Sequence, residues 1–272
     1  MIRDITIGQY YPAESPVHRL DPRVKIVCTL LFLVSLFIQN SLIGYVIATI
    51  FLGCVIHLSR VPLKYIVKGL KPVVILLLFT VVMNLFLTRG GSTLVHFWIF
   101  TITESGLRTS VFMAIRLIYL VMGSSIMTFT TSPNGLTDGL EKLLRPLNRI
   151  NVPVHEVAMM MSIALRFIPI LLEETDKIMK AQMARGADFE SGNLIKKIKA
   201  MIPLLVPLFV SAFRRANDLA MAMEARCYQG GDNRTKMKPL KYHKRDSISY
   251  GILLVYLAGI ILLGKTISIG ML

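Results

Sequence analysis

The feature that most constrains this chain is a series of apolar runs close to the length that crosses a lipid bilayer. A transmembrane helix needs about 20 predominantly apolar residues, within a range of about 17–25, so the shorter runs must include flanking residues. Hydrophobic residues make up 54% of the 272 residues and charged residues 17%, whereas soluble domains are about 25% charged. The sequence therefore predicts an all-α polytopic membrane protein with about five transmembrane helices rather than a soluble enzyme. The runs are Val24–Gln39, Leu42–Leu58, Pro72–Thr88, Ser110–Thr131 and Ile248–Leu263.

The distribution of charge predicts the orientation of these spans. Lysine and arginine total 31 against 16 acidic residues, and such a surplus in an apolar chain is typical of cytoplasmic loops rather than of a nucleic-acid-binding surface. The segment between the second and third runs contains four basic residues and no acid: Arg60, Lys64, Lys68 and Lys71. We therefore predict that residues 59–71 are cytoplasmic and that 89–108 are external. Five spans then place the N-terminus in the cytoplasm and the C-terminus outside.

This topology divides the chain into three parts. Residues 1–131 hold an N-terminal segment and four spans, residues 132–245 form a cytoplasmic region, and residues 246–272 hold the last span. The cytoplasmic region has too few strand signals for a separate α/β domain, so we predict that it is helical.

Three helices are predicted in the cytoplasmic region. A short one covers 134–149, and two long amphipathic helices end near Arg185 and Arg226. Their apolar halves, Val157–Leu172 and Ala200–Phe213, are interrupted by prolines, so we expect partly inserted helices rather than full spans. In the second long helix, alanines at every fourth position either allow close packing of two helices or reflect the helix propensity of alanine. These are Ala212, Ala216 and Ala220.

The two long helices end in the same pattern, A-x-x-A-R. It occurs as AQMARG at 181–186 and as AMEARC at 222–227, and Gly186 stands where a helix C-terminal cap is expected. Small neighbours leave each guanidinium clear to make a forked pair with a carboxylate of a partner. The alternative is that Arg185 and Arg226 are ordinary cations that complement the helix dipole.

A third motif lies near the N-terminus, where residues 18–25 read HRLDPRVK. Together with the two arginine motifs, it resembles the transmembrane T component of energy-coupling factor (ECF) transporters, the EcfT/CbiQ-like family. The similarity covers essentially the whole chain. The residues that match the N-terminal motif of the family are His18, Asp21, Pro22, Arg23 and Lys25. One departure is Cys227, because the family often has glycine at that position.

The resemblance implies a mechanism. A T component joins a membrane-embedded substrate-binding S component to two cytoplasmic ABC-type ATPases, the A components, for uptake of vitamins or other micronutrients across the bacterial cell membrane. Its two long coupling helices cross, and ATP-driven closure of the ATPases moves the helix ends and tilts the S component. Ala184, Arg185 and Gly186 would then contact one ATPase. Ala225, Arg226 and Cys227 would contact the other.

By the same resemblance, the chain is expected to be a non-catalytic subunit. It would bind no cofactor itself, because ATP and Mg²⁺ are used by the partner ATPases. Besides the ATPases and the S component, its expected partner is the lipid bilayer, and no nucleic acid is expected. We predict no catalytic, cofactor-binding or metal-binding residues.

Two other functions were considered from the residues. A self-sufficient secondary transporter or permease, with its own substrate site, predicts ionisable residues within the spans and a repeat relating two halves. Only Arg116 lies within a span, where we expect it to contact protein, and no repeat is visible. A membrane enzyme requires a nucleophile with its base, or clustered acids for a metal. The sequence contains no such set.

One further pattern has the form of a nucleotide-binding loop. Residues Gly259–Thr266 match G-x4-G-K-T. A phosphate-binding loop requires a strand before it and a helix after it, whereas this match lies at the end of the last apolar run. We therefore do not predict a nucleotide site there.

Overall fold

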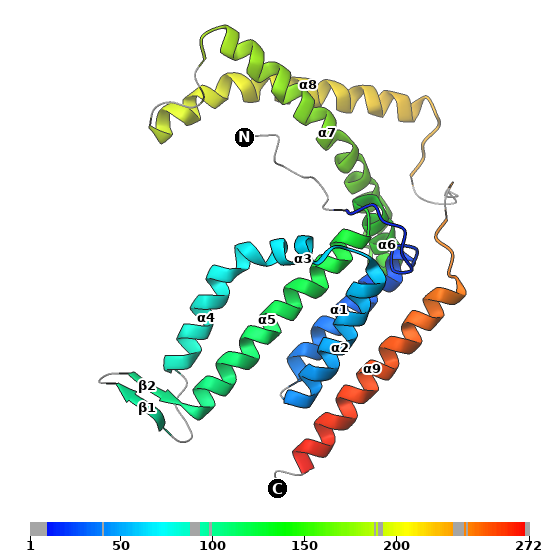
Figure 1. Ribbon diagram of the computed structural model, residues 1–272. Helices are drawn as coiled ribbons and strands as arrows, with labels where there is room; N and C mark the ends of the chain where they lie inside the picture. Colours follow the sequence, from blue (N-terminus) through cyan, green and yellow to red (C-terminus); the bar gives the residue numbers. More distant parts are fainter. Residues whose placement is uncertain are drawn as a thin grey trace. The chain divides into compact units, whose positions relative to one another are not determined.

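The computed structural model describes residues 10–39, 41–87, 93–97, 100–187, 189, 193–230, 237 and 239–269 (Figure 1). Its contacts divide these residues into two compact units. We call residues 10–142 and 240–269 the bundle unit, and the described residues between 143 and 239 the arm unit. The fold is helical throughout, apart from one two-stranded hairpin in the described residues.

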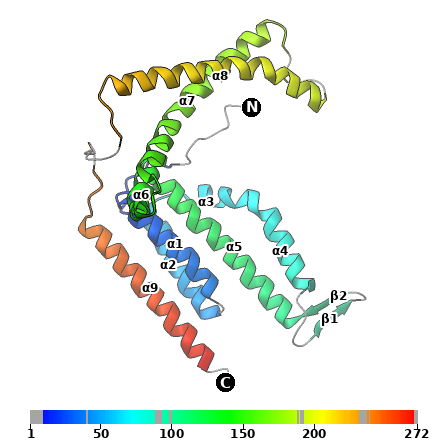
Figure 2. The same cartoon turned by 180° about the vertical axis from the view of Figure 1, so that it is seen from behind.

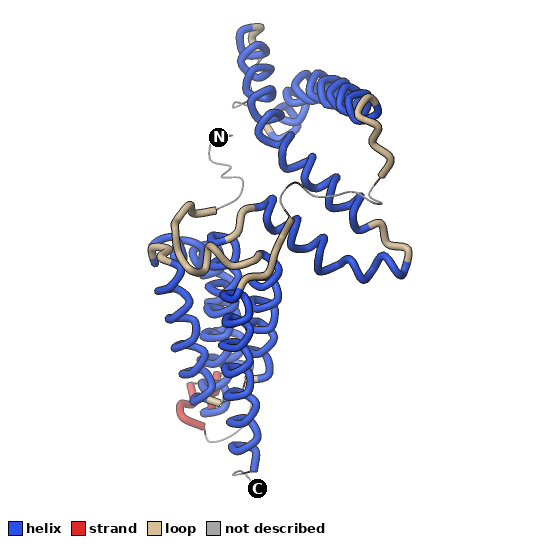
Figure 3. Tube along the Cα trace, turned by 90° about the vertical axis from the view of Figure 1, so that its right-hand side faces the viewer, coloured by secondary structure: helices blue, strands red, loops and turns tan. Residues whose placement is uncertain are grey.

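The bundle unit contains the apolar runs seen in the sequence. Its long helices run alongside one another, with the strands at the end toward which the last helix runs (Figure 3). In chain order its elements are α1 (Pro22–Ile38), α2 (Leu42–Ser59), α3 (Leu63–Leu70), the 3-10 turn η2 (Lys71–Val73), α4 (Val74–Leu87), β1 (Thr93–Phe97), β2 (Phe100–Thr103), α5 (Glu104–Thr130), α6 (Pro133–Leu144, whose last two residues belong to the arm unit) and α9 (Lys244–Ile269).

The core of the bundle lies where α1, α2, α5 and α9 meet. Aromatic rings fill its centre: Phe51 stacks on Tyr256 with centroids 4.4 Å apart, and Phe32 packs beside both. Leu36 and Ile126 are buried against them. The outward faces remain apolar and exposed. A bundle with an apolar core and an apolar surface is suited to a lipid environment.

Five helical segments of the described residues are long and apolar enough to cross a membrane, judged by length and composition alone. They are Leu42–Ser59, Leu63–Phe86, Glu104–Thr130, Val154–Ala184 and Lys244–Leu262. The all-α polytopic fold predicted from sequence is confirmed. Helix α1, with 17 residues, is slightly shorter than these. Helix α7 qualifies through its apolar N-terminal part, although the sequence favoured partial insertion there.

Local signals set the helix boundaries. The side chain of Ser41 accepts a hydrogen bond from the N–H of Gly44 and begins α2 only two residues after α1 has ended at Gln39. This capping follows the usual preference for serine. Pro72 lies in η2, so the third span is bent between α3 and α4 (Figure 1). The helix therefore begins at Leu63 rather than at Pro72 as the apolar run suggested.

The hairpin was not predicted. Strands β1 and β2 pair antiparallel, with Thr93 opposite Thr103 and Phe97 opposite Phe100. They occupy part of the segment 89–108 that the sequence analysis placed outside the membrane. Alternating threonine and large apolar residues favour paired strands, but the segment is too short for this signal to be distinguished from a loop.

The arm unit consists of the 3-10 turn η3 (Arg145–Ile150) and two 31-residue helices, α7 (Val154–Ala184) and α8 (Leu194–Glu224). The two helices cross, and their C-terminal ends lie apart (Figures 1 and 2). The Arg215 guanidinium donates to Glu174 at 3.0 Å across the crossing. The two long helices predicted from the sequence are present, and both continue through their prolines.

The alanine series on α8 does not form the helix crossing. Ala216 and Ala220 are exposed, and only Ala212 is partly covered. The face that packs on α7 instead carries larger side chains, with Leu204 buried and Arg215 partly buried. The alternative interpretation, helix propensity, fits this exposure.

The close contact of α1 with α5 generates a first prediction. A Cβ atom added to Gly123 would lie 2.9 Å from Cε1 of Phe32, whereas one added to Gly259 would meet nothing within 4 Å. We expect Gly123→Leu to lower the free energy of unfolding in detergent micelles by ~1–3 kcal/mol, the usual effect of overpacking. The matched change Gly259→Leu should cause no loss. Equal melting temperatures for the two variants would contradict the packing described here.

Candidate functional site

The two arginine motifs end their helices with the same hydrogen bonds. At the end of α7, the N–H of Gly186 donates to Met183 at 2.9 Å and that of Ala187 donates to Gln182 at 3.0 Å. At the end of α8, the corresponding bonds run from Cys227 to Glu224 at 2.8 Å and from Tyr228 to Met223 at 3.0 Å. This is the Schellman pattern of helix termination. The prediction that both motifs lie at helix C-termini is confirmed.

Each arginine stands directly before a residue in the left-handed conformation. The φ angle is +86° at Gly186 and +55° at Cys227. Glycine adopts this region freely, whereas a Cβ atom there costs about 1–2 kcal/mol. The cysteine thus accepts the backbone shape that glycine would take, and the departure from the family pattern does not change the form of the helix end.

The tips of the two helices are open. Ala184, Arg185, Ala225, Arg226 and Cys227 are all exposed. Because alanine precedes each arginine, no bulky neighbour covers the guanidinium. An exposed, planar, permanently charged group at a rigid helix end is suited to a forked hydrogen bond with a carboxylate on another protein.

The N-terminal motif forms a buried ion cluster in the bundle unit. Asp21 is the N-cap of α1 and accepts the N–H of Arg23 at 2.9 Å. The guanidinium of Arg23 also grips both carboxylate oxygens, at 3.0 Å and 2.9 Å. Burial opposes ionisation of Asp21, but the hydrogen bonds and charge of Arg23 outweigh it and lower the pKa of this carboxyl below its usual value. Asp21 is therefore a carboxylate.

A second carboxylate joins the cluster from the far end of the chain. Asp246, in the first turn of α9, is 1% exposed. It accepts the N–H of Asp21 at 2.9 Å through one oxygen and the N–H of His243 at 2.8 Å through the other. Asp246 is not among the residues predicted from the sequence. An acid at the start of the last apolar run is a signal, but no spacing connects it with a motif 225 residues away.

Lys25 completes the cluster. Its ammonium donates to the carbonyl of His18 at 3.0 Å and to that of Thr130, at the end of α5, at 2.7 Å. Lysine 7% exposed is rare in proteins unless its charge is compensated. Lys25 and two carboxylates are thus buried together with a partly buried Arg23, and the cluster links the N-terminal segment to α1, α5 and α9.

His18 fixes the segment that precedes α1. A carbonyl can only accept, so Nε2 of His18 donates to Tyr11 at 2.9 Å, and Nδ1 accepts from the Ser15 hydroxyl at 2.7 Å. Burial lowers the pKa of His18 below its usual value. The neutral imidazole fits this arrangement, because only one of its nitrogens carries a proton. Pro22, the remaining residue of the motif, packs beneath α6, where a Cβ on Gly139 would meet it at 3.1 Å.

Arg116 has a structural role inside the bundle. Its guanidinium donates to the Gln39 carbonyl at 3.0 Å and to the Tyr45 hydroxyl at 3.2 Å. A charged side chain within a span is expected to find such partners. The sequence expectation that Arg116 contacts protein is confirmed.

Two further sequence patterns can now be placed. The residues Gly259–Thr266 lie inside the continuous helix α9, which has none of the strand–loop–helix geometry that a phosphate-binding loop needs. Within the described part of the chain, no three histidine, cysteine or acidic side chains are grouped so as to hold a metal ion.

Comparison with known proteins agrees with the sequence resemblance. Residues 13–237 match the protein family described as "Cobalt transport protein" (CbiQ). Three similar proteins each carry the name energy-coupling factor transporter transmembrane protein EcfT. The one from Clostridium kluyveri is 58% identical over 92% of this chain and 93% of its own length. Those from Ruminiclostridium cellulolyticum and Bacillus subtilis are 50% and 47% identical over 97% and 96% of this chain, and 98% of their own lengths.

The buried ion cluster generates a second prediction. The two oxygens of Asp246 accept hydrogen bonds from the backbone N–H groups of Asp21 and His243. In Asp246→Asn one oxygen is replaced by an amide NH₂, which cannot accept, so one of these N–H groups loses its acceptor. An unsatisfied buried donor costs about 1–3 kcal/mol, and more in a charged network. We expect a corresponding loss of unfolding free energy in detergent micelles. Asp218→Asn, at an exposed position of α8, is the matched control and should leave stability unchanged. Equal stability of the two variants would rule out a structural role for the cluster.

Proposed function

The chain belongs to the EcfT family of energy-coupling factor transporter transmembrane proteins, and from this premise we propose how it couples ATP hydrolysis to transport. It is the transmembrane component of a multi-subunit transporter and spans the membrane. In the proposal, it is the non-catalytic link between two cytoplasmic ABC-type ATPases and a membrane-embedded substrate-binding S component, for uptake of vitamins or other micronutrients. ATP and Mg²⁺ are bound by the ATPases and not by this chain.

The observation that carries the proposal is the pair of matching helix ends. Two long crossed helices end in the same Schellman geometry, each with an exposed arginine. Arg185 docks in a groove of one ATPase and Arg226 in a groove of the other, with Ala184, Gly186, Ala225 and Cys227 supplying the close-fitting surface. A forked pair with a carboxylate gives each contact both strength and a fixed direction.

The crossing of α7 and α8 transmits the movement. The Glu174–Arg215 ion pair and a hydrogen bond of 3.4 Å from Gln182 to the carbonyl of Pro203 connect the two helices. When ATP draws the ATPases together, the two arginine tips approach each other and the crossing angle changes. Apolar side chains of the helices pass this change to the S component. A helix is stiff along its axis, so displacement at a tip is not lost within the lever.

The charge distribution supports one orientation. The bundle unit carries most of its basic residues where α2 ends and α9 begins, including Arg60, Lys64, Lys244 and Arg245. By the positive-inside rule this end is cytoplasmic, which puts the arm unit on the side of the ATPases and the C-terminus outside a bacterial cell membrane. The alternative, a self-sufficient carrier, is not favoured, because the relatives of this chain are named as transmembrane proteins of energy-coupling factor transporters.

Charge reversal at the two tips tests the proposal. Breaking one partner of a buried interface pair costs ~2–5 kcal/mol, and the second contact then acts at high effective concentration. We expect Arg185→Glu or Arg226→Glu to reduce transport while some complex remains. The double variant should release the ATPases but retain the S component, as measured by co-purification and mass spectrometry.

The matched control is Lys180→Glu with Arg214→Glu. It makes the same charge change at exposed positions on the same helices, and it should leave both assembly and transport intact. Lys196 and Lys197 of α8 do not serve as controls, because their side chains lie outside the described residues. If the double tip variant still bound both ATPases and transported substrate, the arginines would only be helix caps.

The orientation has its own test. In a variant without Cys28, Cys54 and Cys227, single cysteines replace Glu104 or Asn193, which are both exposed. A membrane-impermeant thiol reagent should label only position 104 on intact cells, since 193 would be cytoplasmic. After permeabilisation both positions should react. Labelling of intact cells at 193 but not at 104 would reverse the orientation.

A further inference from the structure

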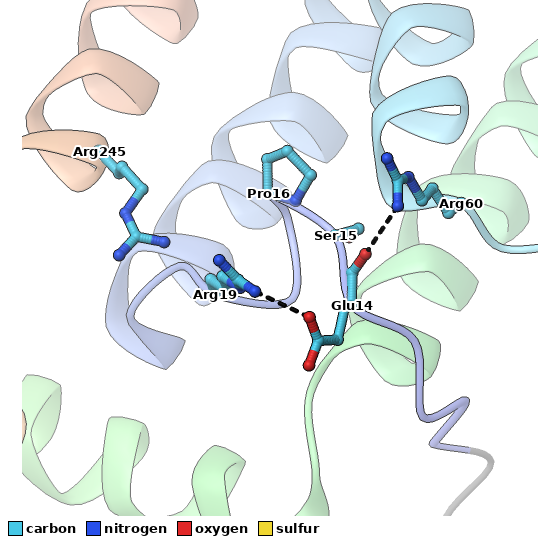
Figure 4. A pocket seen from close by; sticks show the side chains of 6 residues that line it. All are labelled: Glu14, Ser15, Pro16, Arg19, Arg60 and Arg245. Carbon is cyan, nitrogen blue, oxygen red and sulfur yellow. Dashed lines mark hydrogen bonds and ion pairs between the residues drawn. The ribbon is translucent and has the colours of Figure 1, made fainter.

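A pocket in the bundle unit gathers three arginines that coupling does not use. It is lined by the N-terminal segment, the end of α2 and the first turn of α9, and its volume is about 280 Å³. This is near the lower limit for small-molecule sites and suits a compact polar group. Figure 4 shows Glu14 between Arg19 and Arg60, with Arg245 reaching in from α9. The lining residues are Glu14, Ser15, Pro16, Arg19, Arg60 and Arg245.

The charge of this pocket is unbalanced. Three guanidiniums face one carboxylate, Glu14, whose side chain is 88% exposed. Arg19 pairs with Glu14 at 2.9 Å, but an exposed pair contributes little. Arg60 reaches only the Glu14 backbone carbonyl, at 3.4 Å. An anion entering the pocket would therefore meet several donors and could displace one weakly held acid.

The backbone around the pocket is preorganised. Each exposed arginine is adjacent in sequence to a residue that is held by hydrogen bonds or by burial. Arg19 follows His18, whose ring bridges Ser15 and Tyr11. Arg60 stands between buried Ser59 and Val61, with a left-handed φ of 56°. Arg245 precedes Asp246 of the buried ion cluster. The backbone thus fixes the positions from which the three arginine side chains extend around the pocket, so less backbone entropy is lost when an anion binds.

The surface next to the pocket identifies the kind of anion. On α9, Arg245 is followed at helical spacing by Ile248, Ile252 and Val255, which are 61%, 54% and 75% exposed. These positions lie along one face of the helix. A cation at the start of an exposed apolar face, where a span begins, complements the two parts of a membrane lipid. The cation matches a phosphate at the interface, and the apolar face matches the hydrocarbon chains below it.

We propose that this pocket binds the phosphate group of an anionic phospholipid. The arginines provide forked hydrogen bonds to the phosphate oxygens, and the acyl chains lie along the apolar face of α9. A free phosphate offers the same oxygens but no hydrocarbon, so it would bind more weakly. The bound lipid would tie the end of α2 and the start of α9 to the N-terminal segment.

The test measures lipid binding to the purified full-length chain in neutral detergent by native mass spectrometry. The probes are phosphatidylglycerol, phosphatidylcholine and inorganic phosphate. We expect retention of phosphatidylglycerol, and a loss of affinity of about tenfold or more in the triple variant Arg19→Gln, Arg60→Gln, Arg245→Gln, which corresponds to at least one charge-assisted hydrogen bond. Glu14→Gln should tighten binding, because it removes the competing acid.

The matched control removes three cations from the same end of the bundle. Lys64, Lys68 and Lys71 are exposed and lie outside the pocket, so their change to glutamine should alter affinity less than twofold. An equal loss in the two triple variants would show diffuse attraction and overturn the proposal. Inorganic phosphate binding as tightly as the lipid would overturn the lipid assignment, and a failure of Glu14→Gln to tighten binding would overturn the site. Melting temperatures without lipid verify that each variant folds.

Discussion

The bundle depends on burying three charged side chains beside a partly buried arginine without leaving any of the four charges uncompensated. Asp246 is 1% exposed, Asp21 6% and Lys25 7%. An isolated ion at such positions would be strongly destabilising. Here the guanidinium of Arg23 grips Asp21, backbone N–H groups satisfy Asp246, and two carbonyls receive the protons of Lys25. Removing one member leaves its direct partner with an unsatisfied buried group, which is strongly destabilising.

The position of this cluster explains why the motif lies at the start of the first span. Helix α6, through which the chain leaves the bundle unit, packs its Gly139 against Pro22. Tyr242, just after the chain returns, lies under the Arg23 guanidinium at 3.9 Å. The two segments that connect the bundle unit to the arm unit therefore each contact a residue of the N-terminal motif: α6 contacts Pro22, and the segment before α9 contacts Arg23. In the coupling proposed above the arm unit acts as a lever, which is effective only if its attachment does not yield when the other end is moved.

Most of the fold could be predicted from the sequence, because the strongest signals were local. Apolar length located the spans, and the A-x-x-A-R patterns located the C-terminal end of each arm helix. The prediction failed where a local signal is ambiguous. Proline usually breaks a helix, yet Pro169 and Pro203 lie within α7 and α8, which contact each other and so can retain a helix that has lost a hydrogen bond.

The candidate sites divide in the same way. The helix tips are determined by residues adjacent in sequence, so the spacing could place Arg185 and Arg226 at helix C-termini, although their proposed role came from the family resemblance. The ion cluster is determined by tertiary contacts: Asp246 and the Thr130 carbonyl meet the N-terminal motif only after the helices have packed. The spacing of residues along the chain does not predict contacts between segments so far apart in sequence. The resemblance to a family identified the motif, but it did not supply the partners that make it stable.

Arginine illustrates how environment, rather than residue type, sets a function in this protein. Arg23 is paired with a buried carboxylate and serves stability, and Arg116 binds a carbonyl and a hydroxyl within a span. Neither guanidinium can bind a partner without breaking those contacts. Arg185 and Arg226 are exposed where a helix ends in a rigid turn, so binding requires little rearrangement. A guanidinium is costly to bury and permanently charged. A membrane protein with this many arginines must therefore either satisfy each one internally or place it where water, a lipid phosphate or another protein completes its hydrogen bonds.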